Sequence, residues 1–204
     1  DMAIGLGLLF GIRLPINFSS PYKAGSMIEF WRCWHMTLSR FLRDYLYIPL
    51  GGNRHGQGRR YGNLMITMVL GGIWHGAGWT FLVWGALHGL YLLINHGWLA
   101  CRQRLGWWVA APGQLAPQLP LWYRGLSWAV TFIAVAFSLV IFRADSWPIA
   151  VKLCRAMLAL DGLALPFRLQ PIFETLGIHG WHFSRLILIG KKYLILLLIL
   201  SLIA

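Results

Sequence analysis

The longest apolar tract of the chain, residues 64–93, places the strongest limit on its fold. The tract holds no charged residue. At about 1.5 Å per residue, one helix through it would exceed the roughly 30 Å hydrocarbon core of a bilayer. Glycines recur near its middle, at positions 71, 72, 76 and 78, and we therefore predict two helices joined by a break. Breaks at membrane depth are tolerated where they are buried in protein or line a cavity, and membrane proteins often build sites there.

The composition favours a membrane protein over a soluble domain. Apolar residues make up 58% of the chain and charged residues only 12%, about half the charged share of a typical soluble domain. The formal net charge is +12, from 18 Lys and Arg against 6 Asp and Glu. Such an excess can indicate nucleic-acid binding, but here the basic residues stand between apolar runs and form no stripe on a polar domain. Short basic loops between spans are typical of the cytoplasmic side of a membrane.

Three further apolar runs are expected to belong to membrane spans. Residues 125–142 form an uncharged stretch between Arg124 and Arg143. Residues 2–12 have the composition of the end of one span, and residues 193–204 that of the start of another. No charged n-region or cleavage site is present, so a signal peptide is not indicated. We expect the chain to be a piece of a larger protein.

Residues 26–50 combine aromatic and charged side chains in a helical pattern. On a wheel of about 100° per residue, one arc holds Phe30, Trp31, Trp34, His35, Leu38, Phe41, Leu42 and Tyr45. The other arc holds Arg32, Met36, Arg40, Arg43 and Asp44. We predict one amphipathic helix that lies at the membrane interface or flat under the bundle.

Glycine, proline and charge mark three connecting segments. Residues 102–124 and 161–184 contain prolines and glycines and are predicted to be loops. Residues 51–60 are short, basic and glycine-rich, and we place the part from 53 to 60 in the cytoplasm because of its arginines. This segment lacks the GxxxxGKS or GxxxxGKT pattern of a phosphate-binding loop.

Three of the seven histidines lie in apolar surroundings and are candidates for a site: His75, His35 and His88. His75 stands at the predicted break between glycines, and an ionisable residue at membrane depth is a functional candidate by default. His35 lies in the aromatic arc, so we expect it to face protein rather than water. For all three, a hydrogen-bonded packing residue is the alternative interpretation, and it is strongest for His88.

Other kinds of site lack support. Four histidines are interpreted as surface or interface residues: His55, His179, His182 and His96. The three candidate histidines form no HExxH motif and no i, i+4 pair, so a metal site is not predicted. Cys33, Cys101 and Cys154 are far apart and lack zinc-ligand or disulfide-framework spacing. No GxSxG nucleophile motif is present.

A histidine in a dry, apolar pocket can carry out acyl transfer. Near neutral pH an imidazole can take a proton from a hydroxyl and return one to a leaving group. Transfer from a thioester to an alcohol needs little more than this base, alignment of the reactants and donors for the oxyanion. Exclusion of bulk water also limits hydrolysis of the donor. A transferase would therefore have a physical reason to place His75 in such a pocket as its base.

Several motifs occur in a familiar order and at familiar separations. They are FWRCWHMTLS at 30–39, FLRDYLYIPLGGNR at 41–54, GIWHG at 72–76 and WGALHG at 84–89. With these motifs the chain resembles the membrane-bound O-acyltransferase superfamily, and most of all its bacterial alginate O-acetyltransferase-like branch. DMAIG at 1–5 and LPINF at 14–18 also resemble that branch. The resemblance is dense over residues 1–100, and beyond them only FRA at 142–144 matches. Cys33 departs from the pattern, because a basic residue is common there.

The resemblance implies an all-α, polytopic integral membrane bundle with a tunnel, a broken or re-entrant helix and an amphipathic interfacial helix. It implies that residues 1–204 are the C-terminal, catalytic part of a single membrane domain, and that an N-terminal half is missing. The family's essential histidine falls on His75, and its second characteristic histidine falls on His35. A multi-pass location in the bacterial cytoplasmic (inner) membrane is also implied.

The implied activity is transfer of an acyl group, most simply acetyl, to hydroxyls of an exported polysaccharide such as alginate. Peptidoglycan O-acetylation and teichoic acid D-alanylation are alternatives within the family, and a non-catalytic conduit, transporter or scaffold is the alternative outside it. No bound cofactor is expected; the co-substrate would be an activated acyl donor, either acetyl-CoA or a carrier thioester. Expected partners are the lipid bilayer, the polysaccharide acceptor and acyl-carrier or periplasmic acetyl-transfer proteins, with no nucleic acid.

Overall fold

The computed structural model describes residues 2–107, 119–158, 160, 164–166, 171, 175 and 182–184. In chain order, its elements are α1 (Met2–Leu9), the 3-10 turn η1 (Pro21–Lys23), α2 (Met27–Cys33), α3 (Met36–Leu42), the π-helical turn η2 (Arg43–Tyr47), α4 (Gly56–Trp74), α5 (Trp79–Arg104), α6 (Leu121–Arg143), α7 (Trp147–Met157), β1 (Ala164–Pro166) and β2 (His182–Ser184). The predicted helical fold is confirmed, with one exception. β1 and β2 pair in parallel, with Leu165 opposite Phe183, inside a segment predicted to be a loop.

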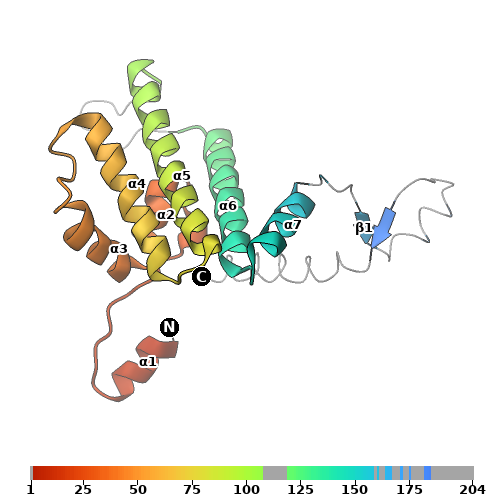
Figure 1. Ribbon diagram of the computed structural model, residues 1–204, viewed down its shortest axis with the longest axis horizontal. Helices are drawn as coiled ribbons and strands as arrows, with labels where there is room; N and C mark the ends of the chain where they lie inside the picture. The colour runs from red at the N-terminus through yellow and green to blue at the C-terminus, as the bar shows by residue number, and fades with distance from the viewer. Residues whose placement is uncertain are drawn as a thin grey trace.

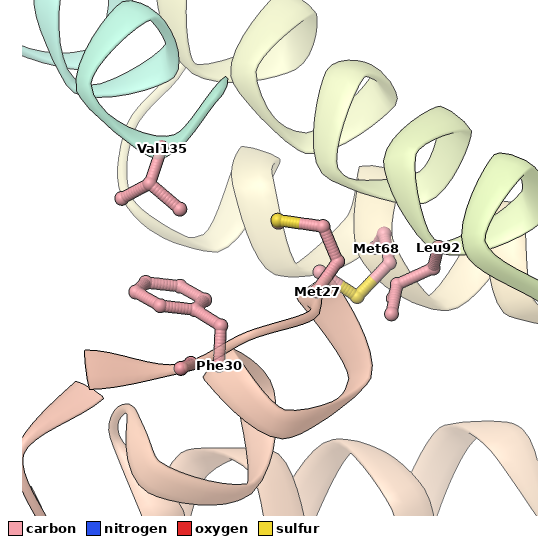
Figure 2. Packing of buried hydrophobic residues seen from close by; sticks show 6 residues of the cluster. Met27, Phe30, Met68, Leu92 and Val135 are labelled. Atoms are coloured by element: carbon pink, nitrogen blue, oxygen red, sulfur yellow. The ribbon is translucent and has the colours of Figure 1, made fainter. Parts of the chain in front are cut away.

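The helices α4, α5 and α6 lie side by side, and α2 packs across them (Figure 1). A buried cluster joins these elements: Ala24, Met27, Phe30, Met68, Leu92 and Val135, of which Figure 2 labels five. Burying a side chain of this size contributes roughly 1.5–3 kcal/mol. The cluster therefore fixes α2, and with it the segment that follows α2, against the three long helices.

The predicted break in the longest apolar tract is confirmed. α4 ends at Trp74 and α5 begins at Trp79, so the break covers residues 75–78. Of the glycines that predicted it, Gly76 and Gly78 lie in the break, whereas Gly71 and Gly72 lie inside α4.

Two glycines let α4 and α5 approach each other closely. A Cβ added to Gly72 would meet the carbonyl oxygen of Phe81 and would lie 3.0 Å from Cα of Gly85. A Cβ added to Gly85 would lie 2.5 Å from the carbonyl oxygen of Met68. Both positions face backbone atoms, which cannot rotate away. The glycines therefore set the distance between the two helices on either side of the break.

The prediction of one amphipathic helix over residues 26–50 is wrong. α2 ends at Cys33, and His35 takes a left-handed conformation with φ 42° and ψ 55°, which is uncommon for a residue other than glycine. The cause lies earlier in the chain. Asn17 accepts hydrogen bonds from the backbone N–H of Met36 at 2.9 Å and of Thr37 at 3.0 Å. These bonds satisfy the first donors of α3, so α3 begins as a separate helix with its own direction.

After this interruption, a single helical wheel no longer predicts which side chains face the protein. Phe41 and Tyr45, which were assigned to the protein-facing arc, are 52% and 69% exposed, whereas Leu42 is buried. The predicted loop 51–60 is likewise divided, because α4 begins at Gly56. The loop predicted over 102–124 is shorter at both ends, since α5 continues to Arg104 and α6 begins at Leu121.

Within the described part of the chain, one helix is long and apolar enough to cross a bilayer. This helix is α6, with a mean hydropathy of 2.2 over its most apolar window, and it contains the predicted span 125–142. α4 and α5 do not meet the same criterion, because their glycines and polar residues lower the mean. α1 covers most of the run 2–12 and has no buried residue. The run 193–204 lies outside the described residues.

Candidate functional site

His75 lies at the C-terminal end of α4, at the start of the break. Its backbone N–H donates to the carbonyl of Gly72 at 3.0 Å. Its ring stands edge-on to Trp84 of α5 and to Phe142 of α6, with ring centroids 5.4 and 5.1 Å away. The side chain is partly buried, and neither ring nitrogen has a hydrogen-bond partner among the described residues. A neutral imidazole in this setting can accept a proton from a substrate hydroxyl.

The structure brings His35 into the same region. The two imidazoles lie close enough to interact electrostatically, although 40 positions separate them in the sequence. The ring of His35 packs beside Phe18 at 5.8 Å, and its Nδ1 is buried without a hydrogen-bond partner in the described part of the chain. The left-handed backbone at His35 makes this placement possible, because it turns the chain between α2 and α3. The structure thus brings the two predicted site residues within electrostatic range of each other.

His88 belongs to a complete hydrogen-bond network. It is only 1% exposed, and its Nδ1 accepts from Nε1 of Trp31 at 3.2 Å. The proton of the neutral ring therefore sits on Nε2, which donates to Oγ of Ser138 at 2.9 Å, an assignment inferred from the network. Oγ of Ser138 in turn donates to the carbonyl of Val135 at 2.8 Å. The network ties α2, α5 and α6 together, as expected for a packing residue.

Two further histidines, His55 and His96, have their own surroundings in the described part of the chain. Nδ1 of His96 is 3.2 Å from Nη2 of Arg60. His55 is exposed at the turn before α4, and His179 lies outside the described residues. His182 is the first residue of β2. Among the described residues, no group of three or more His, Cys, Asp or Glu could hold a metal ion.

Sequence reasoning missed Trp84. It lies four positions before His88 on α5, so both side chains share one face of that helix. Trp84 is 5% exposed, and its ring contacts those of His75, His88 and Phe142. Its Nε1 is buried and has no hydrogen-bond partner in the described part of the chain. The i, i+4 spacing on a helix that follows the break was the signal that could have found it.

Sequence reasoning also missed a basic cleft of about 440 Å³. Its lining combines an apolar floor with polar side chains: Ile28, Trp31, Arg32, Ser39, Leu42, Arg43, Tyr47, Arg60, Leu64, Thr67, Met68, Leu92 and His96. Nε of Arg43 donates to Asp44 at 2.7 Å, and this hydrogen bond holds the pKa of the Asp44 carboxyl below its usual range. Neither His75 nor His35 lines the cleft. It lies along α4 from Arg60, the last residue of the basic segment 53–60, to Met68.

Comparison with known proteins assigns the chain to a family. The profile of the membrane-bound O-acyltransferase family matches residues 1–111, which hold the cluster around His75 except for the residues that α6 supplies. The chain belongs to the membrane-bound O-acyltransferase family. The recognition made from the motifs is confirmed.

Curated relatives include three kinds of transferase. The chain is 45% identical over 165 residues to the peptidoglycan O-acetyltransferase of Helicobacter pylori, covering 81% of this chain and 29% of that protein. It is 48% identical over 157 residues to the probable alginate O-acetylase AlgI of Pseudomonas aeruginosa, covering 77% of this chain and 27% of that protein. It is 33% identical over 155 residues to the teichoic acid D-alanyltransferase of Streptococcus thermophilus, covering 71% of this chain and 37% of that protein. The chain thus spans less than a third of the length of the first two relatives.

Proposed function

We propose that the protein containing this chain is a membrane O-acyltransferase that transfers an acetyl group to hydroxyls of an exported polysaccharide, with His75 as the base. The observation that carries the proposal is the position of His75. It stands at the break between α4 and α5, beside the rings of Trp84 and Phe142, and its ring nitrogens have no partner among the described residues. The family membership and the names of the relatives support the same class of reaction.

The proposed reaction runs in two steps. A ring nitrogen of His75 takes the proton of the acceptor hydroxyl while the hydroxyl oxygen forms a bond to the acyl carbonyl carbon. The carbonyl electron pair moves to the oxygen and gives a tetrahedral intermediate. When this intermediate collapses, the carbon–sulfur bond breaks and the leaving thiolate takes the proton from the imidazolium. Trp84 and Phe142 keep bulk water from the reacting carbon, which limits hydrolysis of the donor.

His35 is proposed to position the donor or to assist proton transfer. It lies within electrostatic reach of His75, and its buried Nδ1 can form a hydrogen bond with the acyl donor near the thioester. The donor, acetyl-CoA or a carrier thioester, would come from the cytoplasm, where the basic segment 53–60 is placed by the positive-inside rule. The acceptor would lie outside the bacterial inner membrane, which the protein would cross several times.

The chain is proposed to be the C-terminal part of one catalytic membrane domain. It spans 29% and 27% of the first two relatives, so most of the domain would come from segments outside this chain. Those segments would complete the tunnel around His75, and the acyl-carrier or periplasmic acetyl-transfer partners would dock on the completed domain.

Transfer of D-alanine to teichoic acid is the second candidate. A relative with that name is 33% identical to the chain, against 45% and 48% for the two acetylases. The difference favours acetyl. A conduit or scaffold without catalysis is the third candidate, and it would leave the cell's acyl esters independent of His75.

The acyl group can be identified without knowing the donor. The gene is deleted and then restored, and esters on the exported polysaccharide and on peptidoglycan are released by mild alkali. We expect acetate on the exported polysaccharide to disappear on deletion and to return on complementation. Released D-alanine that follows the gene would support the second candidate, and acetate on peptidoglycan would change the acceptor. Ester contents that do not respond to deletion would contradict the enzyme assignment.

A further inference from the structure

Two buried polar side-chain atoms in the described part of the chain have no hydrogen-bond partner, and both belong to the region of His75. They are Nε1 of Trp84 and Nδ1 of His35. A buried donor without a partner costs free energy, so native proteins rarely keep one outside a functional site. An indole N–H can only donate, and it cannot relieve the cost by ionising.

Other tryptophans of the same helices show the ordinary arrangement. Nε1 of Trp31 donates to His88, Nε1 of Trp98 donates to the hydroxyl of Tyr123, and Nε1 of Trp128 donates to the carbonyl of Tyr22. Trp98 and Trp128 are more exposed than Trp84, and yet their donors are paired. Two tryptophan rings contact His75, and in the described part of the chain the buried donor without a partner belongs to Trp84, whereas Trp74 is 64% exposed.

From this arrangement we propose that Trp84 is a catalytic residue whose Nε1–H donates a hydrogen bond to the acyl carbonyl oxygen during transfer. This inference rests on the proposed function of His75. The ring of Trp84 stands edge-on to that of His75, with centroids 5.4 Å apart, so an acyl group in contact with His75 also lies beside Trp84. The carbonyl oxygen becomes negative as the hydroxyl attacks, and a donor fixed in a dry site stabilises that charge strongly.

The indole is held in place before the reaction begins. Its ring packs on His88 at 4.6 Å, and His88 is fixed in turn by its bonds with Trp31 and Ser138. The donor therefore needs no reorientation as charge develops, which is the condition for effective electrostatic catalysis. Because protein atoms cover Nε1, entry of the acyl group requires a small displacement of the aromatic side chains around it.

The proton of Trp84 stays on the indole throughout. When the acceptor oxygen bonds to the carbonyl carbon, the π electron pair moves to the carbonyl oxygen, which then accepts the hydrogen bond. When the carbon–sulfur bond breaks, the carbonyl re-forms and the thiolate leaves with the proton held by His75. His75 thus accepts and returns the proton, and Trp84 stabilises the negative charge on the carbonyl oxygen.

The test removes the hydrogen-bond donor of Trp84 and keeps the shape of its side chain. In the full-length protein, benzothienylalanine, which carries sulfur in place of the indole N–H, is introduced at position 84 alone, and Trp84→Phe is prepared in parallel. The same two changes at Trp98, whose Nε1 bonds to Tyr123 at the opposite end of α5, serve as controls. The measurement is the initial rate of acyl-ester formation in complemented cells, divided by the amount of folded protein from size-exclusion chromatography.

We expect both changes at position 84 to lower the rate by about 10²–10³-fold, as for loss of one oxyanion donor, with the benzothienylalanine protein as stable as the wild type. Both controls should keep the wild-type rate. A folded benzothienylalanine-84 protein with full activity would overturn the role of Trp84 if His75→Gln is inactive in the same assay. If His75→Gln is fully active as well, the proposed function fails and the role of Trp84 fails with it.

Discussion

Replacement of Gly85 by alanine should push α4 and α5 apart beside His75. The added Cβ would lie 2.5 Å from the carbonyl oxygen of Met68 and 3.1 Å from Cα of Val69. Non-bonded heavy atoms reach their best separation at about 3.5–4.0 Å, so the backbones must separate by about 1 Å. Overpacking of this kind costs about 1–3 kcal/mol, and alanine returns up to about 1 kcal/mol through helix propensity. We expect a net loss of roughly 1–2 kcal/mol.

The same displacement should slow the reaction. Gly85 follows Trp84 directly, and His75 lies at the end of the opposite helix. A shift of about 1 Å in reacting groups can cost about 10²-fold in rate. Gly97→Ala is the matched control, because Gly97 lies on the same helix and a Cβ there would meet nothing within 4 Å.

Thermal unfolding in detergent and the initial rate of acyl-ester formation per folded molecule measure the two effects. Gly85→Ala should lower both the midpoint temperature and the rate, and Gly97→Ala should lower neither. If Gly85→Ala matched Gly97→Ala in both measurements, the argument that glycine contact positions the site would be refuted.

Three further predictions concern the histidine network, the second histidine and the topology. His88→Leu leaves the indole N–H of Trp31 without its partner and should cost about 1–3 kcal/mol, seen as a lower unfolding midpoint than that of the exposed control His55→Leu. His35→Ala should reduce the acylation rate per folded molecule without reducing the yield of protein; a loss of folded protein at normal specific activity would show a packing role instead. Asn53→Cys, in a protein without its native cysteines, should resist an impermeant thiol reagent in intact cells and react after permeabilisation, and labelling from outside would reverse the assigned topology.

The features predicted correctly from the sequence are those that local pattern determines. The break after Trp74 follows from glycines inside a tract too long for one span, and α6 follows from an uncharged run between Arg124 and Arg143. His75 was singled out for the same reason, since a polar residue between glycines in an apolar tract stands out without any knowledge of tertiary contacts, and the structure places it at the start of the break; its role stays a prediction.

The features that were missed depend on distant partners. The interruption between α2 and α3 requires Asn17, which lies outside the helical pattern that was analysed. A packing role for His88 was already the favoured interpretation of the sequence, but its partners Trp31 and Ser138 lie on two other helices and could not be named from it. The unpaired Nε1 of Trp84 becomes visible only when every neighbouring acceptor is placed. The same holds for the basic cleft, whose walls come from the five elements α2, α3, η2, α4 and α5.

The central claim is that His75 moves the proton in acyl transfer, and the His75→Gln substitution in the full-length protein tests it most directly. Glutamine keeps a similar size and can form hydrogen bonds, but it cannot accept and return a proton near neutral pH. The measurement is the initial rate of ester formation on the exported polysaccharide, per folded molecule in the membrane. The account predicts a fall of at least about 10²-fold, the lower end of what a general base contributes, with membrane insertion and abundance unchanged. A folded His75→Gln protein that acylates at the wild-type rate would contradict it and would make His75 a structural residue.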